Sequence, residues 1–229
     1  MSAKHVKIIK RNKEIFMGLL FSVYNSFKLK NWLKYSQGKR QRIIERVEAK
    51  QAKKLRRPVL PVVVNIDPNC PYFGMFENSA NRQILHINIK LLSEPALRFH
   101  ALETVLHEGR HAYQYNIIKN NKIRFFEFKK KKWRQNYAGY ISSAEDKLFY
   151  GMQPIERDAQ RYSIKKLEKM KFRFKNEDDY YTTLETMTYR YSETEKQLKE
   201  QHGIFYGRKI NNKIKKKSAR KSKFGFPEL

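Results

Sequence analysis

The sequence predicts an α+β fold in which a small twisted sheet packs beside one long helix, with mostly helical basic segments around them. Three short apolar runs, at residues 60–66, 73–76 and 84–89, are rich in β-branched and aromatic residues and predict the strands. Apolar residues at helical spacing over residues 94–118 predict the long helix. We therefore expect one domain over residues 58–203, a basic helical extension over 1–57 and a basic tail over 204–229.

The first predicted elements are separated by clear turn signals. A helix at residues 39–57, with a solvated basic face, ends the N-terminal extension. The first strand then follows Pro58 and Pro61 and stops at Asp67-Pro68-Asn69. Residues 78–81, Asn-Ser-Ala-Asn, predict the turn before the third strand.

The long helix has a suitable beginning and a periodic interior. Ser93 suits the N-cap position, and Glu94 and Pro95 suit the first turn. No further proline or glycine intervenes before Gly109. The apolar face is formed by Leu97, Ala101, Leu102, Val105, Leu106 and Ala112.

The segment His107-Glu108-Gly109-Arg110-His111 on this helix has the H-E-x-x-H spacing of catalytic zinc sites. Two histidines four residues apart project from one helical face, so both imidazoles can reach one metal ion. Glu108 lies at the edge of that face, where it can take a proton from a water on the metal and return it to a leaving amine. Catalytic zinc keeps three protein ligands and an open position, so a third ligand must come from elsewhere. The pattern predicts one Zn²⁺ per chain, with manganese, iron or cobalt as alternatives.

Residues 154–170 predict the helix that supplies the third ligand. Pro154 falls near its first turn, and lysines crowd its end. Glu156 is the best candidate, because small and polar residues follow it on the same face and allow close approach to the metal helix. Asp158 is either an alternative ligand or a carboxylate that orients a histidine. Competing histidine ligands are His86, His100 and His202.

Together these segments resemble the compact gluzincin-type zincin metallopeptidases, including the ImmA/IrrE-like peptidases. The likeness is carried by ILHINIKLL at 84–92, VLHEGRHAYQ at 105–114 and IERDAQRYS at 155–163, within about residues 60–170. It implies a zincin-like fold, ligands His107, His111 and Glu156, and Glu108 as the general base. In that family an edge strand above the active helix binds an extended substrate as an added strand. The resemblance gives this role to Ile84, Leu85, His86, Ile87 and Asn88.

The chain departs from the family pattern at three points. The gap between His111 and Glu156 is longer, and Gly109-Arg110 stands where apolar residues are commoner. No DNA-binding module of the usual kind is present. These departures leave the substrate more open than the reaction.

Residues 119–153 form an insert between the two motif helices, where a segment can act as a lid or a substrate-selecting wall. We expect a helix, a break at Gly139 and a second short helix or loop. Tyr137, Tyr140 and Tyr150 are candidates for stabilising an oxyanion. With 14 tyrosines in the chain, however, we expect packing as the usual role of each of them.

The net charge of +28 exceeds what solubility needs and favours nucleic acid, anionic membrane or acidic protein as partners. Basic and aromatic residues interleave in the insert, which suits phosphate contacts combined with base stacking. No signature of sequence-specific nucleic-acid reading is present. The candidate nucleic-acid contacts are Lys129, Lys130, Lys131, Lys132, Trp133, Lys215, Lys216 and Lys217.

Composition also bears on location. The single cysteine, Cys70, excludes an internal disulfide framework and favours a reducing, cytoplasmic setting, with secretion as the alternative. The apolar stretch at residues 17–27 is too short to span a bilayer, so we expect no transmembrane segment.

Two functions fit the sequence. The first is a zinc-dependent endopeptidase that acts on a protein or peptide and is directed by its basic segments to nucleic acid, nucleic-acid-bound proteins or acidic partners. The alternative is a non-catalytic nucleic-acid-binding protein on the same scaffold. The first is favoured, because a decayed site has no physical need for Glu108.

Overall fold

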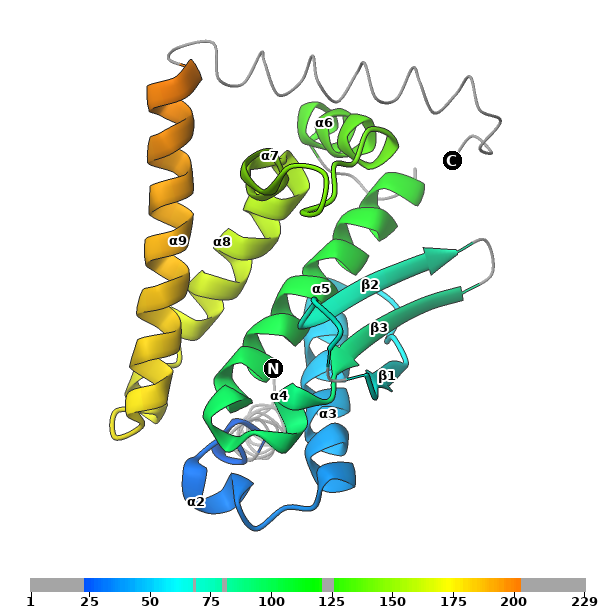
Figure 1. Ribbon diagram of the computed structural model, residues 1–229. Coiled ribbons are helices and arrows are strands. Elements are labelled where there is room, and N and C mark those ends of the chain that lie inside the picture. The colour runs from blue at the N-terminus through cyan, green and yellow to red at the C-terminus, as the bar shows by residue number, and fades with distance from the viewer. Residues whose placement is uncertain (1–22, 68, 80–81, 121–125, 203–229) are drawn as a thin grey trace, which may run out of the picture.

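A computed structural model describes residues 23–67, 69–79, 82–120 and 126–202 of the chain (Figure 1). Its sheet contains β1 (Val62–Asn65), β2 (Gly74–Ser79) and β3 (Arg82–Asn88) in the order β1-β3-β2. β3 pairs in parallel with β1 and antiparallel with β2. The long helix α5 (Arg98–Lys119) runs diagonally between this sheet and α8 (Pro154–Glu168) (Figure 1). The predicted α+β class, with a small sheet packed against a long helix, is confirmed.

Further helices surround this centre. The insert forms α6 and α7 on either side of the break at Gly139, as the sequence predicts. The remaining elements are α2 (Leu29–Trp32), α3 (Gln37–Leu55), α4 (Lys90–Ser93), α6 (Glu127–Ala138), α7 (Lys147–Met152), α9 (Asp178–His202) and the 3-10 turns η1 (Pro95–Leu97) and η2 (Lys171–Arg173). Among the described residues, no helix is both long enough and apolar enough to cross a membrane.

The main hydrophobic core is built around α5. Phe99, Leu102 and Val105 of α5 are fully buried in it, and Ile44 of α3 and Trp32 of α2 belong to the same cluster. The burial of such side chains is the main favourable contribution to folding. The described part of the N-terminal extension therefore shares one core with the helix that carries the motif.

The beginning of α5 differs from the prediction. Ser93 ends α4 and donates its hydroxyl hydrogen bond to the carbonyl of Ile89 at 2.8 Å, so it caps no α5 amide. Pro95 instead opens the turn η1, and α5 begins only at Arg98. The buried Arg98 side chain donates to the Phe27 carbonyl at 2.8 Å, which joins α5 to the segment before α2. The predicted turn at 78–81 is also displaced, because residues 78 and 79 belong to β2, while 80 and 81 lie outside the described residues.

The glycine inside the motif is explained by the packing of α3 on α5. A Cβ at Gly109 would lie 2.6 Å from Nη2 of Arg57 and closer still to Oε1 of Gln51. Arg57 is itself fixed by two 2.6 Å hydrogen bonds to the buried carboxylate of Glu48. An added Cβ would have to displace the ends of these two side chains, so glycine favours this close packing.

Candidate metal centre

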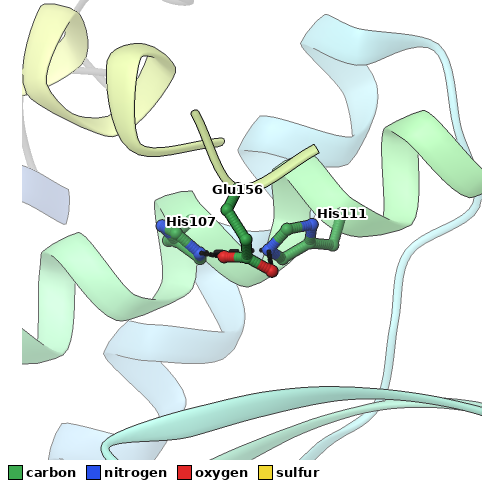
Figure 2. A group of neighbouring side chains, drawn as sticks. All are labelled: His107, His111 and Glu156. Carbon is green, nitrogen blue, oxygen red and sulfur yellow. Dashed lines mark hydrogen bonds and ion pairs between the residues drawn. The ribbon is translucent and has the colours of Figure 1, made fainter. Parts of the chain in front are cut away.

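The two motif histidines and Glu156 meet between α5 and α8. The Nε2 atoms of His107 and His111 are 3.0 Å apart. The Glu156 carboxylate places one oxygen 3.2 Å from Nε2 of His107 and the other 3.4 Å from Nε2 of His111. Figure 2 shows the carboxylate lying between the two rings. The three ligand atoms lie within 4.8 Å of one another.

These spacings suit a single metal ion. Donor atoms about 2.0–2.1 Å from a tetrahedral zinc ion are separated from one another by about 3.3 Å. The two nitrogens are 3.0 Å apart, and each lies 3.2 or 3.4 Å from one of the two Glu156 oxygens, close to that value. The group of His107, His111 and Glu156 could therefore hold a metal ion without a large rearrangement of the chain.

Glu156 reaches this position because α8 packs closely on α5. Pro154 occupies the first turn of α8, and Glu156 follows within that turn. Ala159 and Ser163, on the same face of α8, are fully buried, and the Ser163 hydroxyl donates to Glu103 of α5 at 2.9 Å. The small residues predicted to allow close approach do lie at the interface of the two helices.

Gln114 sets the orientation of His111. Its amide nitrogen donates to the carbonyl of Ile155 at 2.9 Å and to Oδ2 of Asp158 at 3.0 Å. The remaining amide oxygen lies 3.0 Å from Nδ1 of His111. Because a carbonyl oxygen only accepts, Nδ1 carries a proton and Nε2 is the ring nitrogen that faces the site.

Asp158 is not part of the ligand group. Its carboxylate accepts hydrogen bonds from Arg110 at 2.7 Å, Lys129 at 2.8 Å and Gln114 at 3.0 Å. The sequence suggests a direct contact between Asp158 and a histidine. In the structure the amide of Gln114 lies between Asp158 and His111, so Asp158 acts on His111 through Gln114. The arginine of the motif has a structural role here, as the partner of this carboxylate.

Glu108 is held beside the group by the sheet. One of its oxygens, Oε2, accepts a 2.8 Å hydrogen bond from the backbone amide of Phe76 on β2. The contact is close because β2 carries Gly74, where a Cβ would lie 2.9 Å from the His86 carbonyl and closer still to Thr104 of α5. Burial raises the pKa of Glu108, although the nearby charges of His107 and His111 partly oppose this.

In the metal-free protein the three candidate ligands neutralise one another. Burial by itself would lower the pKa of His107, but the hydrogen bond to Glu156 and the charge of Glu108 raise it to about 10. Burial would raise the pKa of Glu156, but the charge of His111 and the hydrogen bonds from both histidines hold it well below its usual range. The carboxylate is thus ionised beside the protonated His107 ring, and a metal ion must displace that proton.

The three candidate tyrosines occupy different positions. Tyr140 donates its hydroxyl to Oε1 of Glu156 at 2.8 Å, and the ring of Tyr150 packs edge-on against Tyr140. Burial and the Glu156 charge raise the pKa of both hydroxyls, so both keep their protons at neutral pH. The Tyr137 hydroxyl instead donates to the carbonyl of His111 at 2.9 Å and joins α6 to α5.

The predicted substrate strand is not an edge strand. The residues assigned to this role, Ile84 to Asn88, lie on β3, which has β1 on one side and β2 on the other. Its backbone groups are already used by two neighbours, so addition of a peptide to β3 is excluded. The prediction was wrong because strand order depends on tertiary pairing. The edge beside Glu108 belongs to β2.

The competing histidines lie apart from the ligand group. Nε2 of His86 is 2.6 Å from Oε2 of Glu77, and the His100 ring packs against Phe73 at 5.6 Å. The side chain of His202 lies outside the described part of the structure.

Two of the predicted nucleic-acid contacts are buried. Trp133 is 1% exposed and belongs to a small core cluster between α5, α6 and α8, which excludes base stacking by this ring in this arrangement. Lys130 is 2% exposed and donates to the carbonyl of Asn120 at 3.4 Å. Lys129 contacts Asp158, Lys131 is exposed and Lys132 is half-buried, so their contact with nucleic acid stays a prediction. Lys215, Lys216 and Lys217 lie outside the described residues.

The structure also adds residues that the sequence analysis missed. Gln114 is three residues after His111, a helical spacing that could have indicated a partner for it. Glu103 is four residues before His107, and its carboxylate lies 3.7 Å from Nδ1 of that histidine. Nothing in the sequence indicated the Phe76 amide, because a backbone donor has no residue signature.

Comparison of the chain with protein-family models, with curated proteins and with solved structures gives no match. The geometry of the site therefore has to carry the functional argument.

Proposed function

We propose that this protein is a zinc-dependent peptidase of zincin type, with His107, His111 and Glu156 as the zinc ligands. The observation that carries the proposal is the meeting of these three side chains, 3.0–3.4 Å apart, with Glu108 fixed beside them. Two histidines and one carboxylate are the donor set of many catalytic zinc sites. When bound there, zinc would supply a Lewis acid that polarises a carbonyl and lowers the pKa of water.

Glu108 is the general base in this proposal. Its Oε2 is occupied by the Phe76 amide, whereas no hydrogen bond among the described residues engages its Oε1. The hydrogen bond from the Phe76 amide fixes the carboxylate. Oε1 can then accept the proton of the attacking water and pass it to the leaving amine. Tyr140, which bonds Glu156, and Tyr150, which packs on Tyr140, are protonated at neutral pH and are the hydroxyl donors that could stabilise an oxyanion.

The proposed place for an extended peptide is the edge of β2 that no other described strand occupies, beside the Phe76 amide that bonds Glu108. The Phe76 amide points away from β3 towards Glu108, so alternate backbone groups of β2 face the site rather than the sheet. A peptide that pairs with this edge would pass beside Glu108. This assignment replaces β3, whose two edges are both occupied.

Metal content tests the ligand set. The protein should be purified without added zinc and analysed by elemental mass spectrometry, as wild type and as His111→Ala, Glu156→Ala and the control Glu200→Ala. We expect about one zinc ion per chain in the wild type and the control, and little in the two ligand variants. Absence of stoichiometric metal from the wild type, even after zinc is supplied and the excess removed, would refute the proposal.

Hydrolysis tests the general base separately. Glu108→Gln keeps the hydrogen bond to Phe76 but cannot accept a proton, so zinc content should persist while cleavage of a proteome-derived peptide library stops. A zinc-loaded wild type that cleaves nothing in the library would instead favour the non-catalytic alternative.

A further inference from the structure

A cluster of like charges joins side chains from α3, α8 and η2, beside the α5 helix on which α3 and α8 both pack. Lys166 on α8 lies close enough to Lys54 on α3 for this neighbour to lower its pKa. One turn earlier on α3, Lys50 lies close enough to Arg173 of η2 to be influenced by its charge, and Lys169 adds a further charge near Lys166. We call these five residues the α3/α8 seam.

Three lysines of the α3/α8 seam have no acidic partner among the described residues. No ion pair within the described ranges involves Lys54, Lys166 or Lys169. By contrast, the buried Arg57 meets the carboxylate of Glu48. Unneutralised charges brought together repel one another, so the seam costs the fold stability.

Two tyrosine rings partly offset this repulsion. The ammonium group of Lys50 lies 4.2 Å from the ring centre of Tyr24, and that of Lys166 lies 5.1 Å from the ring centre of Tyr162. Such cation–π contacts favour the charged lysine. Even so, burial and the neighbouring cations lower the pKa of Lys50 to about 8 and that of Lys166 to about 7. The tyrosines therefore fix the positions of both ammonium groups.

An exposed aromatic ring stands at one end of the seam. The side chain of Phe172 is 64% exposed. The guanidinium of Arg173 lies 5.0 Å from the centre of its ring. A basic row that ends in an exposed aromatic ring is the combination used to bind single-stranded nucleic acids, whose bases stack on such rings.

We propose that the α3/α8 seam binds the phosphodiester backbone of a single-stranded nucleic acid, with Phe172 stacking on a base. A phosphate between Lys54 and Lys166 would replace their repulsion by two attractions. Lys50 lies about 6 Å further along α3 than Lys54. A nucleic-acid strand that follows the seam would therefore contact cations at successive positions. Lys50, Lys166 and Arg173 are half-buried, which suits a narrow flexible strand better than a flat bilayer. This binding is independent of the metal site.

The test compares two pairs of lysines in the full-length protein. Binding of a fluorescent 12-nucleotide DNA strand of mixed sequence is measured by anisotropy at several salt concentrations. Lys54→Gln/Lys166→Gln removes the facing pair of the seam. Lys165→Gln/Lys199→Gln removes the same charge from exposed positions on α8 and α9. Loss of two phosphate contacts should lower the salt slope by about 1.4 and weaken binding about 25-fold at 0.1 M salt.

Thermal unfolding of the same variants tests whether a loss of binding reflects a folding defect. The seam variant should have an unchanged or higher Tm than wild type, because it relieves repulsion, while its affinity falls. Phe172→Ala should weaken binding about fivefold or more without changing the salt slope.

Three outcomes would overturn the proposal. The first is a difference of less than threefold between the seam pair and the control pair, which would assign binding to the general positive charge. The second is no binding of the strand by the wild type. The third is seam-dependent binding to vesicles of phosphatidylserine and phosphatidylcholine without seam-dependent binding to DNA, which would identify a membrane surface instead.

Discussion

Replacing Gln114 by methionine should weaken metal binding although residue 114 does not itself contact a metal. The buried amide of Gln114 holds Nδ1 of His111 at 3.0 Å and also bonds Ile155 and Asp158 of α8. One side chain therefore sets the tautomer of one ligand and the position of the helix that carries Glu156. Methionine has a similar length but offers neither the acceptor for Nδ1 nor the two donors.

The size of the effect follows from these contacts. Loss of the partner that orients a metal-bound histidine commonly costs 10–100-fold in metal affinity, or about 1.4–2.8 kcal/mol. The variant also leaves Nδ1 of His111 and the Ile155 carbonyl without this partner in a buried place. That lowers the free energy of unfolding of the metal-free protein by about 2 kcal/mol and its Tm by about 4–8 °C.

Competition with a chromophoric chelator measures zinc affinity, and calorimetry of the metal-free protein measures stability. Gln51→Met is the matched control, because Gln51 is also buried and donates to an α5 carbonyl, that of Leu106, at 2.8 Å. The control should lose stability but keep its zinc affinity within about twofold. If Gln114→Met loses stability while its zinc affinity matches the control, Gln114 only supports the fold and the reasoning about His111 is refuted.

Three further predictions concern the surroundings of the site. Gly109→Ala should lower the free energy of unfolding by about 1–3 kcal/mol, since the added methyl group meets Gln51 and Arg57, and urea unfolding measures this. Gly74→Ala should push β2 away from Glu108 and reduce the rate of hydrolysis more than zinc content, as single-turnover assays beside metal analysis would show. Zinc uptake at pH 7 should release at least one proton, because the raised pKa of His107, about 10, keeps this ring protonated in the metal-free protein. Below that pKa, zinc affinity therefore rises with pH. Calorimetric titration in buffers of different ionisation enthalpy would contradict this if the observed heats were the same.

The local part of the site could be read directly from the sequence. His107 and His111 share a face of α5 because side chains four residues apart on any α-helix do so. Glu156 and Asp158 could be told apart only in part. Two residues apart, they point about 200° away from each other around the helix axis, so only one of them can face α5 directly. Which one does so depends on how α8 crosses α5, and the contacts of Ala159 and Ser163 decide that in favour of Glu156.

The sequence by itself determined the residue types of the site, their helical spacing, the α+β class and the basic character of the chain. The tertiary structure decided that β2 rather than β3 is the edge beside Glu108, that Trp133 is buried, and that Lys54 lies near Lys166. The physical reason is the range of the interactions. Helix periodicity acts between residues three or four apart, whereas strand order, burial and charge contact depend on packing between segments far apart in the chain.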